Sequence, residues 1–190
     1  VRAGWNVCVV HGNGPQVGDE LVRNELAREE ANPLPLGVLV AETAGWIGYM
    51  IQQSIENALR RAGSAREVAT IITQVQVRAD DPALQNPTKF IGQALSPERA
   101  EELRREGYAV KIDGRGNLRR VVGSPAPQAI HELNVIKRLV ERGTIVICAG
   151  GGGIPTMYDE KGQLHGVEAV IDKDLASALL AEQLDADLLV

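Results

Sequence analysis

The sequence is poor in cysteine and aromatic residues, and these shortages exclude several classes of protein. Cys8 and Cys148 each sit in a short apolar run outside any Cys/His cluster, so we expect two buried, reduced thiols rather than a disulfide framework or a zinc site. Aromatic residues make up 3% of the chain, too few for a surface that stacks nucleic-acid bases. His11, His131 and His165 lack metal-ligand spacing, and we assign no metal ligand to the chain.

Long apolar runs and an excess of positive charge are also missing. No stretch approaches the roughly 20 apolar residues of a membrane span, and no signal peptide is visible, so we expect a cytoplasmic protein that does not bind membranes. The formal net charge of −5 argues against a general nucleic-acid binder. Apolar residues at 44% and charged residues at 24% are typical of a soluble globular protein with one sizeable core.

Short β-branched runs alternate along the chain with longer stretches of helical spacing. The pattern predicts strands at residues 6–10, 67–77, 144–149 and 187–190. It predicts helices at residues 16–30, 38–61, 127–142 and 173–183, with Gly63 and Gly143 as the stops of the second and third. Strands that alternate with helices indicate parallel β-α-β units and a covered sheet.

The middle of the chain breaks this alternation. Residues 78–97 are polar, contain three prolines and show no clear period. Ser96 and Pro97 then predict the start of a short helix, and the runs 108–113 and 118–122 around GRGN predict a β-hairpin. This insertion is either a surface excursion without function or a small lid over the C-terminal edge of the sheet.

Two glycine-rich segments follow predicted strands and are candidates for binding. In HGNGPQVG, Gly12, Asn13 and Gly14 lie between a strand and a helix, which indicates either an anion seat at the helix N-terminus or a tight turn without a ligand. Gly150 to Gly153 also follow a strand directly, and either a close ligand or a flexible loop explains them. This second segment fits neither the P-loop nor the GxGxxG pattern.

A charged triplet forms the third candidate segment. Asp172, Lys173 and Asp174 stand where an apolar run meets a predicted helix. Aspartates are common at helix starts as caps, but the charge of Lys173 opposes the helix dipole there. A lysine between two aspartates, near glycine-rich loops, could instead bind a transferred phosphoryl group.

Six segments together resemble carbamate kinases of the amino acid kinase family. They are HGNGPQVG, GWIGYMIQQ, NPTKFIG, GRG followed by RRVV, CAGGGGIP and GVEAVIDKDLAS, which occur in the family's order from about residue 7 onward. The resemblance implies a three-layer α/β/α sandwich with a mostly parallel sheet, in which residues 1–190 form a partial kinase domain and residues 79–123 an inserted lid, the lid segment. It also implies a homodimer and reversible phosphoryl transfer from ATP to carbamate with Mg²⁺, ATP-forming in arginine breakdown.

The resemblance also assigns roles to individual residues. The expected catalytic residues are Lys89, Lys173 and Asp174. The expected substrate-binding residues are Gly12, Asn13, Gly14, Gly150, Gly151, Gly152 and Gly153. Lys173 would neutralise charge on the phosphoryl group, Asp174 would orient the cationic groups, and Lys89 would reach in from the lid segment. No general base is expected, because carbamate already carries an anionic oxygen.

Departures from the family pattern leave alternatives open. Phe90 stands where the family pattern has proline, and the family's first strand with its GGNA turn and its nucleotide-holding half are absent. We therefore expect the isolated chain to turn over poorly. A sibling kinase for another small carboxylate or phosphate, and a non-catalytic paralogue, are the alternatives. The apolar stripe of Ala44, Ile47 and Ile51 beside Trp46 and Tyr49 indicates either core packing or a dimer seam.

Overall fold

The computed structural model describes residues 4–190 and is built around a parallel sheet of three short strands. In this sheet β8 (Ile145–Ile147) lies between β1 (Cys8–Val9) and β2 (Val68–Thr70), and both neighbours run parallel to it. The three residues of β8 are fully buried, as expected for a strand covered on both faces. The predicted parallel sheet is confirmed.

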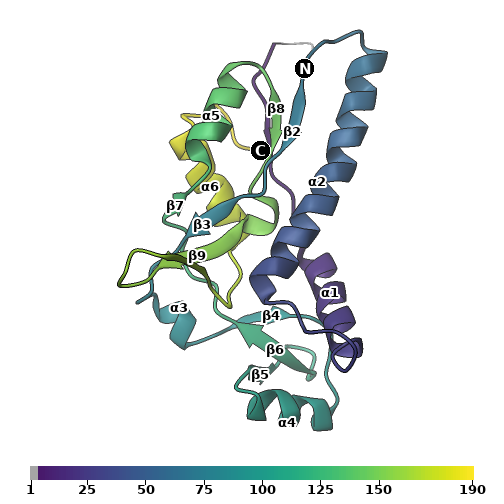
Figure 1. Cartoon of the computed structure of the whole chain (residues 1–190), viewed down its shortest axis with the longest axis vertical. Helices are drawn as coiled ribbons and strands as arrows, with labels where there is room; N and C mark the ends of the chain where they lie inside the picture. The colour runs from purple at the N-terminus through teal and green to yellow at the C-terminus, as the bar shows by residue number, and fades with distance from the viewer. Residues whose placement is uncertain (1–3) are drawn as a thin grey trace.

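Helices cover both faces of this sheet, so the predicted three-layer α/β/α fold is confirmed. The long helix α2 (Leu36–Arg61) lies on one side, and α5 (Leu133–Glu141) and α6 (Lys173–Gln183) lie on the other (Figure 1). Helix α6 has the predicted bounds, and Gly63 and Gly143 take the left-handed conformation expected at helix stops. The main core cluster includes Val75, Val146 and Ile136.

A second sheet corrects two sequence predictions. Its order is β10 (Leu164–Gly166), β9 (Ile154–Tyr158), β3 (Gln74–Gln76) and β7 (Ala129–Ile130). Residues 67–77 do not form one strand but two, β2 and β3, in different sheets. The chain bends between them, where Thr73 Oγ1 accepts a hydrogen bond from the Ala149 amide at 2.9 Å. The predicted helix 127–142 begins only at Leu133, because Ala129 and Ile130 pair with β3.

The predicted strand at residues 187–190 is wrong, and the first helix is shorter than predicted. Residues 187–190 form no ladder with another described strand, and Leu188 and Leu189 are exposed. Without a paired neighbour, an apolar run cannot close strand hydrogen bonds. Helix α1 (Gly14–Leu26) ends at Leu26, and turns follow it.

The lid segment forms a separate antiparallel sheet of β4 (Lys89–Ile91), β6 (Leu118–Val122) and β5 (Ala109–Ile112). It also carries α3 (Pro82–Gln85) and α4 (Pro97–Arg105), and Ser96 caps α4 by accepting the Arg99 amide at 3.2 Å. The predicted hairpin and cap are confirmed. The lid segment lies at the end of the molecule opposite the two chain termini (Figure 1). There Ile91 and Val122 pack with Val17 of α1.

Helix α2 approaches β2 closely at one glycine. A methyl group at Gly48 would lie 2.4 Å from Thr70 Cγ2, whereas one at Gly45 would meet Ile72 Cδ1 at an ordinary 3.6 Å. The neighbouring Ala44 and Ile47 are buried, while Trp46 and Tyr49 are 37% and 61% exposed. The apolar stripe predicted for this helix is therefore partly buried in the core. A dimer contact through the exposed Trp46 and Tyr49 remains a prediction.

We predict opposite effects of alanine at these two glycines. Gly45→Ala should raise the free energy of unfolding by about 0.5–1 kcal/mol, because alanine favours the helix. Gly48→Ala should lower it by about 1–2 kcal/mol, because the methyl group overpacks against Thr70. Urea denaturation followed by circular dichroism measures both. Thr70→Ser should recover part of the loss in the Gly48→Ala background; equal stability of the two single variants would contradict the close contact.

Candidate active site

The first glycine-rich loop joins β1 to α1 and is anchored by Asn13. The Asn13 side chain is buried, and its Nδ2 donates to Thr43 Oγ1 of α2 at 3.0 Å. The Thr43 hydroxyl in turn donates to the Leu39 carbonyl at 2.8 Å. The loop is therefore held against α2, and the N-terminus of α1 opens toward the space beyond it. The amides of Gly14 and Gln16 precede the first helical bond, which runs from Val17 to the Asn13 carbonyl.

The second glycine-rich loop follows β8 and packs directly on the first. The Gly151 amide donates to the His11 carbonyl at 2.8 Å. A methyl group at Gly151 would lie 2.1 Å from Asn13 Oδ1, and one at Gly150 would lie 2.5 Å from His11 Nε2. Similar contacts with Ile171 O at 2.7 Å and Val75 Cγ2 at 2.5 Å exclude side chains at Gly152 and Gly153. Close packing therefore explains all four glycines, against the first loop at Gly150 and Gly151, against Ile171 at Gly152 and against Val75 of β3 at Gly153.

This packing also uses the amides that a ligand would need. Besides Gly151, the amides of Gly152 and Gly153 donate to the carbonyls of Ala149 and Gly150. Of the four glycines, only Gly151 lines the cavity described below. A substrate-binding role for Gly150, Gly152 and Gly153 remains a prediction, and the observed contacts give these residues a structural role.

The charged triplet begins α6. Asp172 Oδ1 accepts hydrogen bonds from the amides of Asp174 at 2.9 Å and Leu175 at 3.4 Å, so Asp172 is the N-cap of the helix. Its other oxygen, Oδ2, accepts from Lys89 Nζ of the lid segment at 3.2 Å. These bonds, that of the Asp174 amide first, hold the pKa of Asp172 below its usual value. Lys173 Nζ donates to Asp174, which raises the Lys173 pKa.

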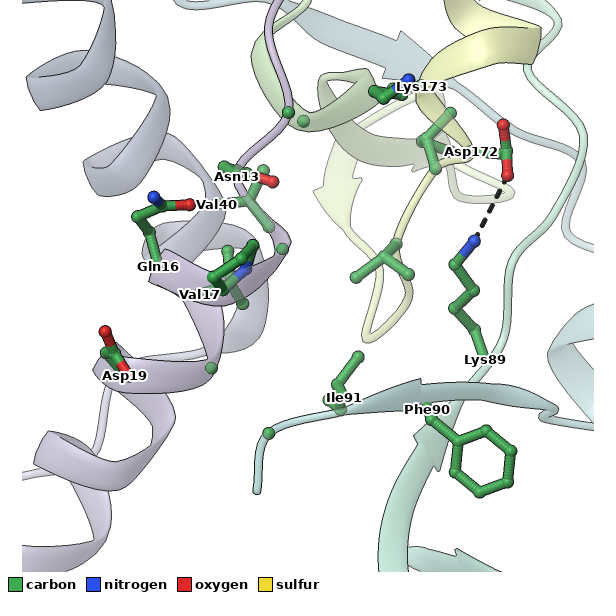
Figure 2. Close-up of a pocket in the computed structure, with 18 of the residues that line it drawn as sticks. Asn13, Gln16, Val17, Asp19, Val40, Lys89, Phe90, Ile91, Asp172 and Lys173 are labelled. Atoms are coloured by element: carbon green, nitrogen blue, oxygen red, sulfur yellow. Dashed lines mark hydrogen bonds and ion pairs between the residues drawn. The ribbon is translucent and has the colours of Figure 1, made fainter. Parts of the chain in front are cut away.

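These segments surround one cavity of about 910 Å³. Figure 2 shows α1, with Asn13, Gln16 and Asp19, on one wall, and Lys89 facing Asp172 on the other. Among the predicted residues, the lining includes Gly12, Asn13, Gly14, Lys89, Gly151, Lys173 and Asp174. Residues from six separate stretches of the sequence therefore meet at the carboxyl ends of β1 and β8, where open α/β sheets bind ligands.

The lid strand β4 presents alternate faces to this cavity. Lys89 and Ile91 point toward α1 and α6 in Figure 2, and the Phe90 ring points to the opposite face of the strand. There the Arg119 guanidinium lies 5.6 Å from the centre of the Phe90 ring, and its Nη2 donates to the Gly92 carbonyl at 2.7 Å. Phe90 therefore packs beneath Lys89 without blocking it.

Sequence reasoning missed several lining residues. Asp172 was visible within the charged triplet, but its bond to Lys89 spans 83 residues and no local pattern contains it. Arg119 belongs to the RRVV run, and Gln16 and Asp19 to the first turns of α1. The partner of Asn13, Thr43, carries no motif and only packing reveals it.

Comparisons with known proteins show the family to which the chain belongs. The model of the amino acid kinase family matches residues 1–190. The chain belongs to the amino acid kinase family. It is 54% identical over 187 residues to a carbamate kinase of Haemophilus influenzae, covering 97% of this chain and 58% of that protein. It is 48% identical over 191 residues to a carbamate kinase of Pyrococcus furiosus, covering 99% and 60%.

Solved structures of carbamate kinases share this fold. The carbamate kinase of Giardia lamblia bound to AMP-PNP superposes with a TM-score of 0.90 at 39% identity, covering 98% of this chain and 59% of that one. The chain thus spans about 60% of the length of these relatives. No helix within residues 4–190 is both long and apolar enough to cross a membrane.

The same part of the chain gathers no group of three or more His, Cys, Asp or Glu side chains that could hold a metal ion. Mg²⁺ in kinases is commonly bound by one or two carboxylates together with the phosphates of the nucleotide. The described residues therefore do not form such a metal site by themselves.

We predict that the contact between the two loops makes Gly151 unusually sensitive. Gly151 and Gly162 both have positive φ, +67° and +75°, but space is open only at Gly162. Gly162→Ala should therefore cost about 1–2 kcal/mol of unfolding free energy from backbone strain. Gly151→Ala should cost about 1–3 kcal/mol more from the clash with Asn13. Urea denaturation measures both, and Asn13→Ala should recover part of the loss; similar losses for the two single variants would contradict the contact.

A second prediction concerns acid. Because the Asp172 pKa is lowered on folding, its contribution to stability is present above the unfolded value of about 4 and is lost as pH falls through the folded value. Carbon-detected NMR of the Asp172 carboxyl group should give a titration midpoint below that of an aspartate in an unstructured peptide. The contribution is small because the group is exposed. An Asp172 midpoint at or above 4 would contradict the cap.

Proposed function

We propose that this chain supplies the carbamate- and phosphoryl-binding part of a carbamate kinase, which transfers phosphate reversibly between ATP and carbamate. The observation that carries the proposal is the convergence of Lys89, Lys173 and the N-terminus of α1 on one cavity. The sequence likeness to carbamate kinases supports the choice of substrate. The likeness covers about 60% of those proteins, so the proposal concerns the complete gene product.

The residues of the cavity suit phosphoryl transfer, which depends on positioning and charge neutralisation. We assign Lys173 to the oxygens of the transferring phosphoryl group and Lys89 to the same group from the lid side. The free amides at the first turn of α1 and its helix dipole favour an anion beside Gly12 and Gly14. Asp174, bonded to Lys173, orients that lysine. Carbamate already carries its anionic nucleophilic oxygen, so no general base is needed.

We further propose the nucleotide, the metal ion, the direction of the reaction, its location and the oligomeric state. ATP and ADP are the nucleotide substrates, with Mg²⁺ bound to their phosphates. The reaction forms ATP in arginine breakdown, in the cytoplasm, and the protein is a homodimer. The exposed Trp46 and Tyr49 on α2 are consistent with a dimer contact there. The lid segment at residues 79–123 closes over the cavity and brings Lys89 with it.

The decisive experiment measures ATP formation from carbamoyl phosphate and MgADP by the complete gene product. Lys173→Ala should lower kcat by about 100- to 1000-fold, the usual loss when one preorganised donor to a developing charge is removed. Lys161→Ala, at the exposed turn between β9 and β10, is the matched control and should have the activity of the unaltered protein. The isolated 190-residue chain should turn over poorly.

Two outcomes would redirect the proposal. Absence of ATP from a folded complete protein would sink carbamate kinase, and acetyl phosphate or uridine diphosphate in parallel reactions would test a sibling kinase. Full activity of Lys173→Ala would instead remove Lys173 from the site while leaving the reaction in place.

A further inference from the structure

A short stretch of chain that leads into α6, the helix that carries Lys173, also contacts the lid segment. It comprises residues 167–172, between β10 and α6, and we call it the strap. The Val170 amide donates to the Gly123 carbonyl at 3.1 Å, and Ala169 forms a parallel bridge with Gly123, just after β6. On its other side, the Ile171 carbonyl lies against Gly152 of the second loop. The strap is therefore fixed between the base of the lid sheet and the active-site loops.

The first carboxylate of the strap, Glu168, divides its oxygens between the lid and the body. Oε1 forms an ion pair with Arg120 of β6, and Oε2 accepts from the amide of Leu36, the first residue of α2, at 3.3 Å. The Arg120 guanidinium also lies 3.9 Å from the centre of the Tyr108 ring, and the Arg120 side chain is only 13% exposed. The Glu168 side chain is 47% exposed, so the guanidinium, and not the carboxylate, is the shielded partner of this contact.

The second carboxylate, Asp172, has the same division of oxygens. Oδ2 accepts from Lys89 of β4, and Oδ1 caps α6 through the Asp174 amide. The two contacts differ in their cations: the Lys89 side chain is 48% exposed, against 13% for Arg120, and no described aromatic ring stacks on Lys89. The Asp172 side chain is 36% exposed. Exposed ion pairs of this kind are weak and exchange readily.

We propose that Glu168 and Asp172 are positioning residues that form a two-point clamp between the lid segment and the body. Glu168 with Arg120 is the fixed point, which keeps the lid sheet at the N-terminus of α2. Asp172 with Lys89 is the releasable point, which holds Lys89 beside the cavity until an anionic ligand takes its place. Asp172 therefore competes with the ligand for Lys89. This ligand is the phosphoryl group of the proposed function, on which that part of the inference rests.

Substitution with the isosteric amides separates the two points while retaining the helix contacts. Asparagine is a good N-cap, so Asp172→Asn keeps α6 capped and removes only the charge facing Lys89. Glu168→Gln likewise keeps an acceptor for the Leu36 amide. The matched control is Asp159→Asn, because Asp159 also accepts backbone amides, from Lys161 and Gln163, in an exposed turn away from the cavity.

Two measurements on the ligand-free complete protein test the clamp without using catalysis. Acetylation of Lys89 by an N-hydroxysuccinimide ester, followed by mass spectrometry, should be about twofold to fivefold faster in Asp172→Asn, the factor expected for an exposed ion pair. Amide hydrogen exchange of β5 and β6 should be faster in Glu168→Gln and unchanged in Asp172→Asn. Unchanged Lys89 acetylation, or unchanged exchange in Glu168→Gln, would overturn the corresponding point of the clamp.

Kinetics distinguish competition from mere support of the fold. With carbamoyl phosphate and MgADP, Asp172→Asn should lower the KM for carbamoyl phosphate by about twofold to fivefold, because the competing carboxylate is gone. An unchanged or raised KM would overturn the competition. If the complete protein makes no ATP, the proposed function fails, while acetylation and hydrogen exchange still decide the clamp.

Discussion

The parallel pairing of β1 with β8 is the constraint on which the site depends. Cys8 lies opposite Val146, so the two strands end side by side although they are far apart in the sequence. The loops that follow them then meet at the bond from the Gly151 amide to the His11 carbonyl. From this contact, Asn13 extends the arrangement to Thr43 of α2, and Gly152 extends it to the strap before α6. Each wall of the cavity is therefore positioned relative to β1 and β8.

The glycines show how one sequence feature can have two physical explanations. A run of four glycines after a strand is compatible with a ligand that approaches the backbone, and equally with a neighbouring loop that does so. Here the neighbouring loop supplies the close contacts of Gly150 and Gly151, other neighbours supply those of Gly152 and Gly153, and three of the four amides are already bonded. The run nevertheless serves the site, because these close contacts are what bring Asn13 and the start of α1 to the cavity.

Local signals predicted the elements whose contacts are local, and long-range contacts account for the failures. Helix α6 has its predicted bounds because its cap, Asp172, lies next to its first residue. The cap at Ser96 and the hairpin of β5 and β6 are similarly local. In contrast, the break between β2 and β3 depends on a bond from Ala149 to Thr73, and β7 exists only because β3 lies beside it. Neither partner is visible from the segment itself.

The same distinction applies to the candidate site, where residue types were easier to predict than pairings. Lys89, Lys173 and Asp174 line one cavity as the sequence motifs suggested, but the partner of Lys89 is Asp172, which the motifs presented only as a cap. The cavity is lined by the cations Lys89, Arg119 and Lys173 and by the carboxylates of Asp19, Asp172 and Asp174. Binding an anion there therefore requires exchange of existing partners rather than simple attraction to a positive surface.

This balance of charge bears on how the site can select its ligand. Lys89 and Lys173 already have carboxylate partners at their exposed ends, so each exchange returns little energy by itself. A singly charged anion that reaches one lysine gains only one such exchange. A phosphoryl group carries several acceptor oxygens, and in the proposed function it meets both lysines and the amides at the start of α1 together, so that the charge-assisted bonds add. The paired cations thus favour a ligand that replaces both carboxylates at once, which is the property that the proposed phosphoryl transfer needs.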